Sequence, residues 1–169
     1  MRLMLMRHAK ATHSAEYEDF DRPLAAKGRE DATMMGGYIA SQRFRPEVAL
    51  VSAAVRTSQT WDIVKAYTGN TQTRSMRELY NVSPEGILSV IESVESNVST
   101  LMVVGHNPSI AFLANSLADF GEKAVLEDIA SKYPTSAMAV LDFDITSWRD
   151  IKSAPGTLSA FVYPKVFSA

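Results

Sequence analysis

Short apolar runs alternate with segments of helical periodicity along this chain, and this alternation is the feature that most constrains its fold. Runs that are apolar throughout are typical of parallel strands buried on both faces, and the segments between them are long enough for crossover helices. The pattern predicts an α/β fold, a three-layer α/β/α sandwich with a mostly parallel central sheet. Because the last two runs alternate more, we allow for one antiparallel edge strand. The predicted strands are Leu3–Met6, Val48–Val51, Leu101–Val104, Met138–Phe143 and Leu158–Tyr163, with a weaker one at Gln72–Met76.

The helices between these strands carry recognisable start signals. Ser83-Pro84-Glu85 supplies an N-cap, a proline at the first helical position and an acidic residue near the positive helix end. Asn107-Pro108 is expected to repeat this arrangement. A further helix is expected from about Ala25 to Gln42, and Gly36-Gly37 within it indicates close packing against a neighbour.

Composition narrows the class of protein. A chain of 169 residues is near the usual size of one domain, so we expect a single domain over residues 1–169. The absence of cysteine excludes disulfides, iron–sulfur clusters, thiolate zinc sites and cysteine nucleophiles. A net charge of −2 argues against nucleic acid or an anionic membrane as a partner. The first apolar run is too short for a signal peptide or a membrane span, so we expect a cytoplasmic protein.

Two of the three histidines follow predicted strands directly. His8 comes after the first strand, and His106 comes after Leu101–Gly105. In open α/β sheets, ligands bind in the crevice outside the carboxyl ends of the strands, so Arg7, His8 and His106 are candidates for one shared cleft. The alternative is that each histidine only caps its strand through a local hydrogen bond.

A third strand end adds a cation to this crevice. Val48–Val51 leads into Ser52–Thr60, a small-residue turn followed by a helix that carries Arg56 in its first turn. The planar guanidinium fork suits phosphate oxygens, and helix N-termini offer free N–H groups to anions. Two arginines, two histidines and two helix N-termini together predict a pocket for a phosphoryl group.

These segments resemble a known family. Arg7-His8-Ala9-Lys10, Arg22-Pro23-Leu24 followed by Gly28, Ser52–Thr60, Arg77-Glu78-Leu79 and Gly105-His106-Asn107-Pro108 are similar, in this order, to the motifs of the histidine phosphatase superfamily, the phosphoglycerate-mutase-like group. The small SixA-type phosphohistidine phosphatases are the branch that the chain resembles most. Ala9 departs from the pattern, since glycine usually follows the Arg-His pair, and this raises the question whether the backbone there needs a positive φ.

The resemblance implies a role for each matched residue. His8 would be the nucleophile that forms a phosphohistidine intermediate, which agrees with the nucleophilicity of a neutral imidazole. Arg7, Arg56 and His106 would surround the phosphoryl oxygens, with His106 at least partly protonated beside a phosphate dianion. Glu78 would donate a proton to the leaving group, or else be a solvated loop residue paired with Arg77 or Arg74. Arg22 and Asn107 would contact the substrate, and Arg22 could instead hold its loop through Glu18, Asp19 or Asp21.

The remaining candidates are interpreted as structural. We expect Lys10 and His13 to be solvated rather than catalytic, and Trp61 and Trp148 to be packing residues. Asp142 and Asp144 are expected on the solvent face of a late strand. Because no carboxylates adjoin His8 or His106, we expect no metal site and no cofactor.

Three functions remain open from the sequence. The first is a phosphatase acting on phosphohistidine of a signalling or phosphotransfer protein, and the second is a phosphatase for a small metabolite such as a sugar phosphate. The third is a non-catalytic phosphate-binding module. Glu78 and His106 are only 28 positions apart, which leaves little chain for a lid. An open pocket favours a phosphoryl group presented on a protein surface. The oligomeric state is not predicted.

Overall fold

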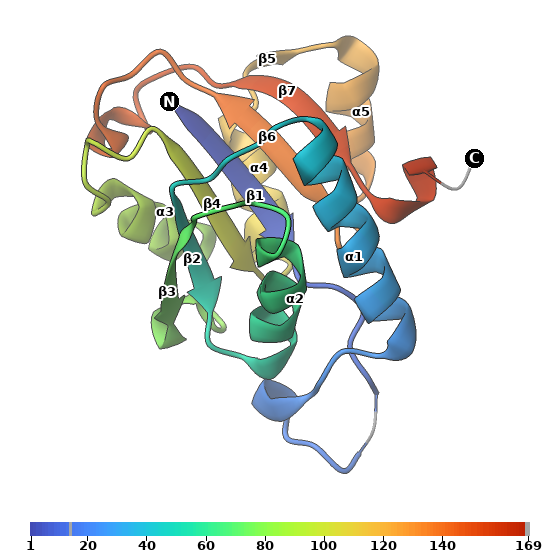
Figure 1. Cartoon of the computed structure of the whole chain (residues 1–169). Coiled ribbons are helices and arrows are strands. Elements are labelled where there is room, and N and C mark those ends of the chain that lie inside the picture. Colours follow the sequence, from blue (N-terminus) through green and yellow to red (C-terminus); the bar gives the residue numbers. More distant parts are fainter. Residues whose placement is uncertain (14, 168–169) are drawn as a thin grey trace.

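The computed structural model describes residues 1–13 and 15–167 and shows a single seven-stranded sheet with helices on both faces (Figure 1). The strand order is β3-β2-β4-β1-β6-β7-β5. The strands are β1 (Arg2–Arg7), β2 (Val48–Ser52), β3 (Gln72–Met76), β4 (Thr100–Gly105), β5 (Phe120–Gly121), β6 (Met138–Asp142) and β7 (Thr157–Val162). The helices are α1 (Ala26–Ser41), α2 (Val55–Lys65), α3 (Pro84–Glu92), α4 (Ser109–Leu117) and α5 (Lys123–Ser131). This is the expected α/β sandwich; β5 and α5 were not expected.

The antiparallel strand lies inside the sheet rather than at its edge. β1 to β4 pair in parallel, whereas β6 is antiparallel to both of its neighbours, β1 and β7. No crossover helix separates β6 from β7, so the chain turns back and β7 pairs beside β6 in the opposite direction. The sheet continues beyond β7 to β5, which pairs with β7 in parallel. An antiparallel strand was therefore expected correctly, but it does not lie at the edge of the sheet.

The alternation of strand side chains divides the interior into two cores. Leu3 and Leu5 of β1 face the side covered by α3, α4 and α5, while Met4 and Met6 face α1 and α2. Figure 1 shows α1 and α2 together in front of the sheet. Trp148 packs in the first core and Trp61 in the second, so both are packing residues as expected.

The helix start signals are confirmed in one case and wrong in the other. The Ser83 side chain accepts a hydrogen bond from the N–H of Gly86 and caps α3. α4 has no side-chain cap, because the helix begins at Ser109 and Pro108 occupies the cap position. The Asn107 amide nitrogen donates to the carbonyl of Tyr133 at 2.9 Å. In α1, a Cβ on Gly36 would lie 2.4 Å from the Tyr67 ring, whereas a Cβ on Gly37 would meet nothing within 4 Å, so the expected close packing is confirmed at Gly36 alone.

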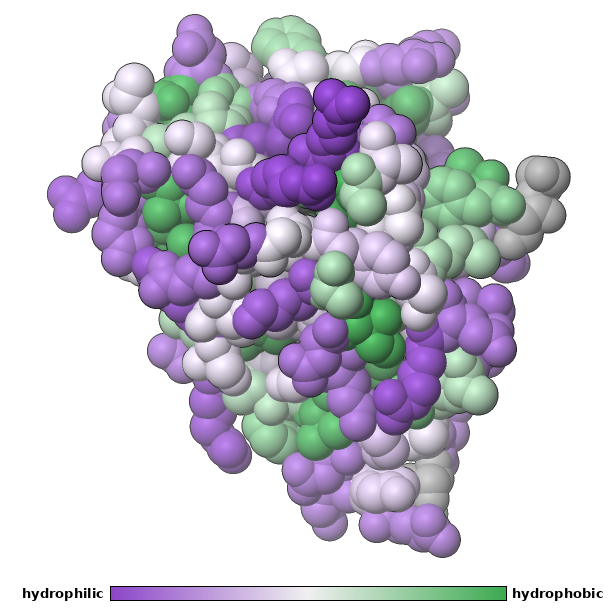
Figure 2. All heavy atoms as spheres, viewed as in Figure 1, coloured by the Kyte–Doolittle hydropathy of each residue, from purple (hydrophilic) through white to green (hydrophobic). Residues whose placement is uncertain are grey.

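The surface is mainly hydrophilic on the face shown in Figure 2, where hydrophobic residues form areas separated by polar side chains. Across the described residues, no helix combines the length and the apolar character that a membrane crossing needs.

Candidate active site

A cavity of about 570 Å³ lies beyond the carboxyl ends of β1, β2 and β4. Strand pairing places these three ends side by side, because β4 lies between β1 and β2. The cavity contains every predicted site residue except Glu78. Its lining residues are Arg7, His8, Lys10, Ala11, His13, Asp19, Arg22, Arg56, Asn81, His106, Asn107 and Thr135.

His8 is held as a neutral imidazole with a defined tautomer. Burial, together with the nearby charges of Arg56 and Arg7, lowers its pKa to about 4. Nδ1 lies 2.8 Å from the carbonyl oxygen of Ala9, which can only accept a hydrogen bond. Nδ1 therefore carries the proton, and the lone pair of the neutral ring resides on Nε2. This is the protonation state that a nucleophilic histidine requires.

His106 stands beside His8, with the ring centroids 5.2 Å apart. Its Nε2 is 2.8 Å from the hydroxyl of Ser52, a buried residue at the end of β2. Burial, together with His8 and Arg56, lowers the pKa of His106 to about 3. The ring is therefore neutral in this structure, and the partial protonation expected from the sequence would require the charge of a bound anion.

Arg7 and Asn107 share one anchor. Arg7 donates from a terminal nitrogen to the carbonyl of Tyr133, the acceptor also used by the Asn107 amide. Tyr133 is itself fixed, since its hydroxyl donates to the carbonyl of Leu5 and accepts from the N–H of Ala139. Tyr133 is not among the residues predicted from the sequence, because it contributes a backbone oxygen, which every residue type carries.

Arg56 is almost fully buried and is held by Asp19. One terminal nitrogen donates to the Asp19 carbonyl and the other to its carboxylate. The Asp19 carboxylate also accepts hydrogen bonds from Tyr80 and from Arg22. These bonds, that from Tyr80 foremost, lower the pKa of Asp19 to about 2, so the group is a carboxylate at neutral pH.

Two donors in this cavity have no acceptor. The Nε atoms of Arg7 and Arg56 are buried and make no hydrogen bond within the described part of the chain. A buried N–H without an acceptor costs about 1–3 kcal/mol, and more when the donor is charged. Both arginines are thus ready to bind oxygen atoms of an anion.

Arg22 holds its loop, which is one of the two roles considered for it, by donating to the Asp19 carboxylate and to the carbonyl of Thr12. It also lines the cavity, so contact with the substrate stays a prediction. Lys10 and His13, expected to be solvated, are exposed but lie at the border of the same cavity.

Glu78 lies apart from the other candidates. Its side chain is exposed and is not part of the cavity lining. The neighbouring arginines have other contacts, because Arg74 pairs with Glu95 at 2.8 Å and Arg77 lies over the Phe20 ring. Arg74 and Arg77 are therefore held by these other contacts and not by an ion pair with Glu78.

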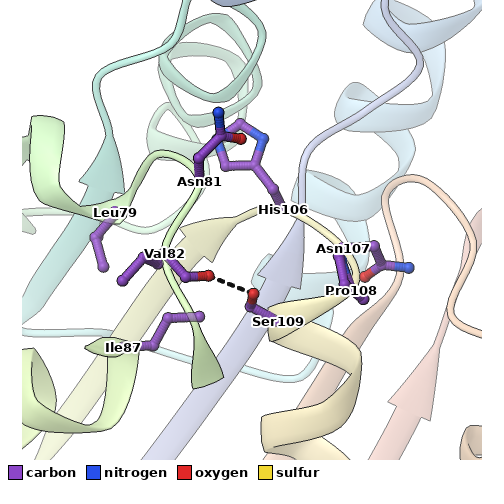
Figure 3. A pocket seen from close by; sticks show the side chains of 8 residues that line it. All are labelled: Leu79, Asn81, Val82, Ile87, His106, Asn107, Pro108 and Ser109. Atoms are coloured by element: carbon purple, nitrogen blue, oxygen red, sulfur yellow. Dashed lines mark hydrogen bonds between the residues drawn. The ribbon is translucent and has the colours of Figure 1, made fainter. Parts of the chain in front are cut away.

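A smaller cavity of about 240 Å³ adjoins the first at Asn81, His106 and Asn107 (Figure 3). Leu79, Val82 and Ile87 form an apolar wall opposite the start of α4. The Ser109 hydroxyl donates to the carbonyl of Val82 and so ties α4 to the segment before α3.

Ala9 fits the chain without a positive φ. The non-glycine residues with positive φ in the described part are Arg43, Asn81 and Ser136. The side chain of Ala9 is fully buried, and its N–H donates to the Thr60 hydroxyl. Alanine in place of the usual glycine therefore creates no backbone strain here.

Comparison with known proteins agrees with this geometry. Residues 3–142 match the family model of the histidine phosphatase superfamily (branch 1). The uncharacterized protein Rv1276c of Mycobacterium tuberculosis is 36% identical over 163 residues, which cover 95% of this chain and 100% of that protein.

Solved structures with the same fold include two proteins assigned as SixA phosphohistidine phosphatases. The one from Agrobacterium tumefaciens has 32% identity and a TM-score of 0.81, covering 96% of this chain and 97% of its own. The one from Nakamurella multipartitia has 28% identity and a TM-score of 0.84, covering 96% and 95%. A mycobacterial glucosyl-3-phosphoglycerate phosphatase, at 15% identity and a TM-score of 0.62 over 94% of this chain and 97% of its own, is similar in fold alone.

Proposed function

Because the chain belongs to the histidine phosphatase superfamily, we propose that it hydrolyses phosphohistidine on a signalling or phosphotransfer protein through a covalent intermediate on His8. The observation that carries the proposal is the pair of buried Nε–H donors on Arg7 and Arg56 beside a neutral His8. A phosphoryl group supplies acceptor oxygens for both donors and an electrophilic phosphorus for Nε2.

In the first step, Nε2 of His8 forms a bond to phosphorus while the bond from phosphorus to the substrate imidazole breaks. Arg7 and Arg56 neutralise the charge on the equatorial oxygens, and His106 would contact the same group. The phosphorylated His8 ring is cationic, and its Nδ1–H donates to the Ala9 carbonyl. In the second step, water attacks phosphorus, the P–Nε2 bond breaks, and His8 regains its neutral tautomer.

The choice of phosphohistidine rests on the lack of a protonated carboxyl group inside the cavity. Asp19 is the carboxyl group in the lining that the structure describes, and its lowered pKa keeps it ionised. An imidazole protonated at its other nitrogen leaves as a neutral molecule and needs no proton from the enzyme. An alkoxide leaving from serine or a sugar does need one, and Glu78, the donor implied by the resemblance, could supply it only from outside the cavity.

Charge neutralisation in this proposal comes from side chains rather than a metal ion. Among residues 1–13 and 15–167, no three histidine or carboxylate side chains come together as a ligand set. We expect activity to be unchanged by excess EDTA.

A turnover panel tests the proposal. Phosphohistidine, phosphoserine and phosphotyrosine peptides and sugar phosphates are compared at matched concentrations by phosphate release. The proposal predicts that phosphohistidine has the highest kcat/KM. Efficient turnover of sugar phosphates alone would favour the metabolite phosphatase, and phosphate binding without turnover of any substrate would favour a non-catalytic module.

A further inference from the structure

A basic cavity adjoins the catalytic one, and the mechanism does not use it. It has a volume of about 300 Å³ and shares Lys10 and Thr135 with the catalytic cavity. Its lining residues are Lys10, Lys27, Asp31, Pro134, Thr135, Tyr163, Pro164 and Lys165, and we call it the lysine pocket. Resting on the proposed function, we propose that the lysine pocket binds an acidic side chain of the phosphorylated protein, next to its phosphohistidine.

The charges in the lysine pocket leave a net excess of cations. The Lys27 ammonium lies 2.8 Å from the largely buried carboxylate of Asp31, so these two charges compensate each other. Lys10 and Lys165 form no ion pair within the described part of the chain. The neighbouring Lys132 is already paired with Asp128 at 2.9 Å. One incoming carboxylate would therefore meet two uncompensated ammonium groups.

The walls of the lysine pocket suit an amino-acid side chain. Pro134, Tyr163 and Pro164 supply apolar ring surface between the lysines. The methylene groups of a glutamate or aspartate can pack on these rings while the carboxylate accepts from the ammonium groups. A second phosphate group in place of this carboxylate side chain would bind the lysines only, because it has no methylene groups to pack on the rings.

The position of the lysine pocket next to the reacting group is fixed by close packing. A Cβ on Gly28 would lie 2.1 Å from the carbonyl oxygen of Lys10, so the first turn of α1 is pressed against the Lys10 backbone. This contact holds Lys27, the residue before Gly28, beside Lys10. A substrate residue near the phosphohistidine can thus reach the lysine pocket while the phosphoryl group lies at His8.

Negatively charged residues lie on the loop that carries Asp19, at another border of the catalytic cavity. Asp19 lines the catalytic cavity, but its charge is compensated by Arg22 and Arg56. Glu18 and Asp21 of the same loop form no ion pair within the described part of the chain. These two carboxylates repel an acidic substrate residue, whereas the lysine pocket attracts it. The two charged borders would therefore orient the protein substrate.

The test uses two phosphohistidine peptides of equal length that carry either glutamate or glutamine on both sides of the phosphohistidine. The wild-type protein is compared with the variant Lys165→Gln, which removes an uncompensated ammonium group that lines the lysine pocket but not the catalytic cavity. A small phosphoramidate serves as the substrate without flanking residues. We expect wild type to favour the glutamate peptide in kcat/KM by about three- to tenfold at low salt, through KM. The Lys165→Gln variant should lose most of this preference and keep normal phosphoramidate turnover.

Lys123→Gln is the matched control. Lys123, the first residue of α5, is exposed like Lys165 and does not line the lysine pocket. The control should keep the full preference for the glutamate peptide. Equal kcat/KM for both peptides in wild type, or a preference that survives in full in Lys165→Gln or disappears in the control, overturns the inference and leaves the phosphohistidine phosphatase standing. Failure to hydrolyse either peptide or the phosphoramidate overturns both.

Discussion

Asp19 accepts hydrogen bonds from both terminal nitrogens of Arg56, at 2.5 Å through its backbone carbonyl and at 3.1 Å through its carboxylate. The Nε atom of the same guanidinium is buried without an acceptor in the described chain. The Asp19 loop therefore uses the terminal nitrogens of Arg56 and leaves Nε for a ligand. In this arrangement Asp19 is a positioning residue, since it acts on the phosphoryl group through Arg56.

Asp19→Asn should weaken the positioning of Arg56. The variant keeps the backbone carbonyl but replaces the charged acceptor shared by Arg56, Arg22 and Tyr80. We expect kcat/KM to fall by about tenfold, which corresponds to the loss of one charge-assisted hydrogen bond at the weak end of the usual range. The effect on kcat should be larger than the effect on KM. Steady-state kinetics on a phosphoramidate measure this split, and Asp21→Asn, in the same loop but outside the cavity lining, is the control. An unchanged kcat/KM in Asp19→Asn would refute the positioning role.

Gly28→Ala should disrupt the site through the backbone. The added methyl group would overlap the carbonyl of Lys10 and push α1 away from the loop after His8. We expect a lower Tm and a loss of activity. Gly37→Ala, in the same helix, is the control, because nothing lies within 4 Å of its new Cβ. It should stabilise the helix by up to about 1 kcal/mol. Thermal unfolding of both variants decides the point, and equal Tm values for the two would contradict the packing argument.

Stability should fall as the solution is acidified through the range where free histidine titrates. The folded-state pKa values of His8 and His106, about 4 and about 3, lie below the value of about 6.5 expected in the unfolded chain. Between about pH 6.5 and 4 the unfolded chain binds protons that the folded chain does not, so the free energy of unfolding decreases as pH falls.

Urea unfolding at pH 7.5 and pH 5 measures this loss. The variant His106→Asn should lose less stability than wild type over the same interval, because one of the two depressed pKa values is removed. A loss equal to that of wild type would show that His106 is not held neutral by the fold.

Glu78→Gln should affect turnover differently for substrates with different leaving groups. We expect turnover of phosphohistidine or a phosphoramidate to change by less than about twofold, because the imidazole needs no donor, and turnover of alkyl phosphates to fall more strongly. Single-turnover kinetics on both substrate types make the comparison independent of product release. Equal losses on both would remove Glu78 from proton donation.

The strands and the central residues of the site could be predicted because each rests on a local pattern. An apolar run followed by Arg7-His8, or by Gly105-His106, specifies both the buried strand and the polar group at its end. Parallel pairing puts these ends on the same edge of the sheet, and the strand order β2-β4-β1 makes them neighbours, so His8, His106 and Arg56 meet in one cavity.

Contacts set by tertiary structure could not be predicted. The Tyr133 carbonyl that anchors Arg7 comes from a segment 126 residues away, and nothing in its type indicates this role. β5 has only two residues, too few for a periodic pattern, and the place of β6 inside the sheet depends on how β7 pairs with it. Asn107 had a plausible local use as a helix cap, but its amide binds Tyr133 instead.

The most direct test of the account is to identify the phosphorylated residue during turnover. Rapid quenching of the wild-type protein with phosphoramidate, followed by mass spectrometry under conditions that preserve acid-labile phosphate, should place phosphate on His8. His106→Ala should still give phosphorylated His8 at a reduced rate, and His8→Ala should give neither phosphoenzyme nor turnover. Phosphate trapped on His106, or near-normal turnover by His8→Ala, would contradict the proposed mechanism.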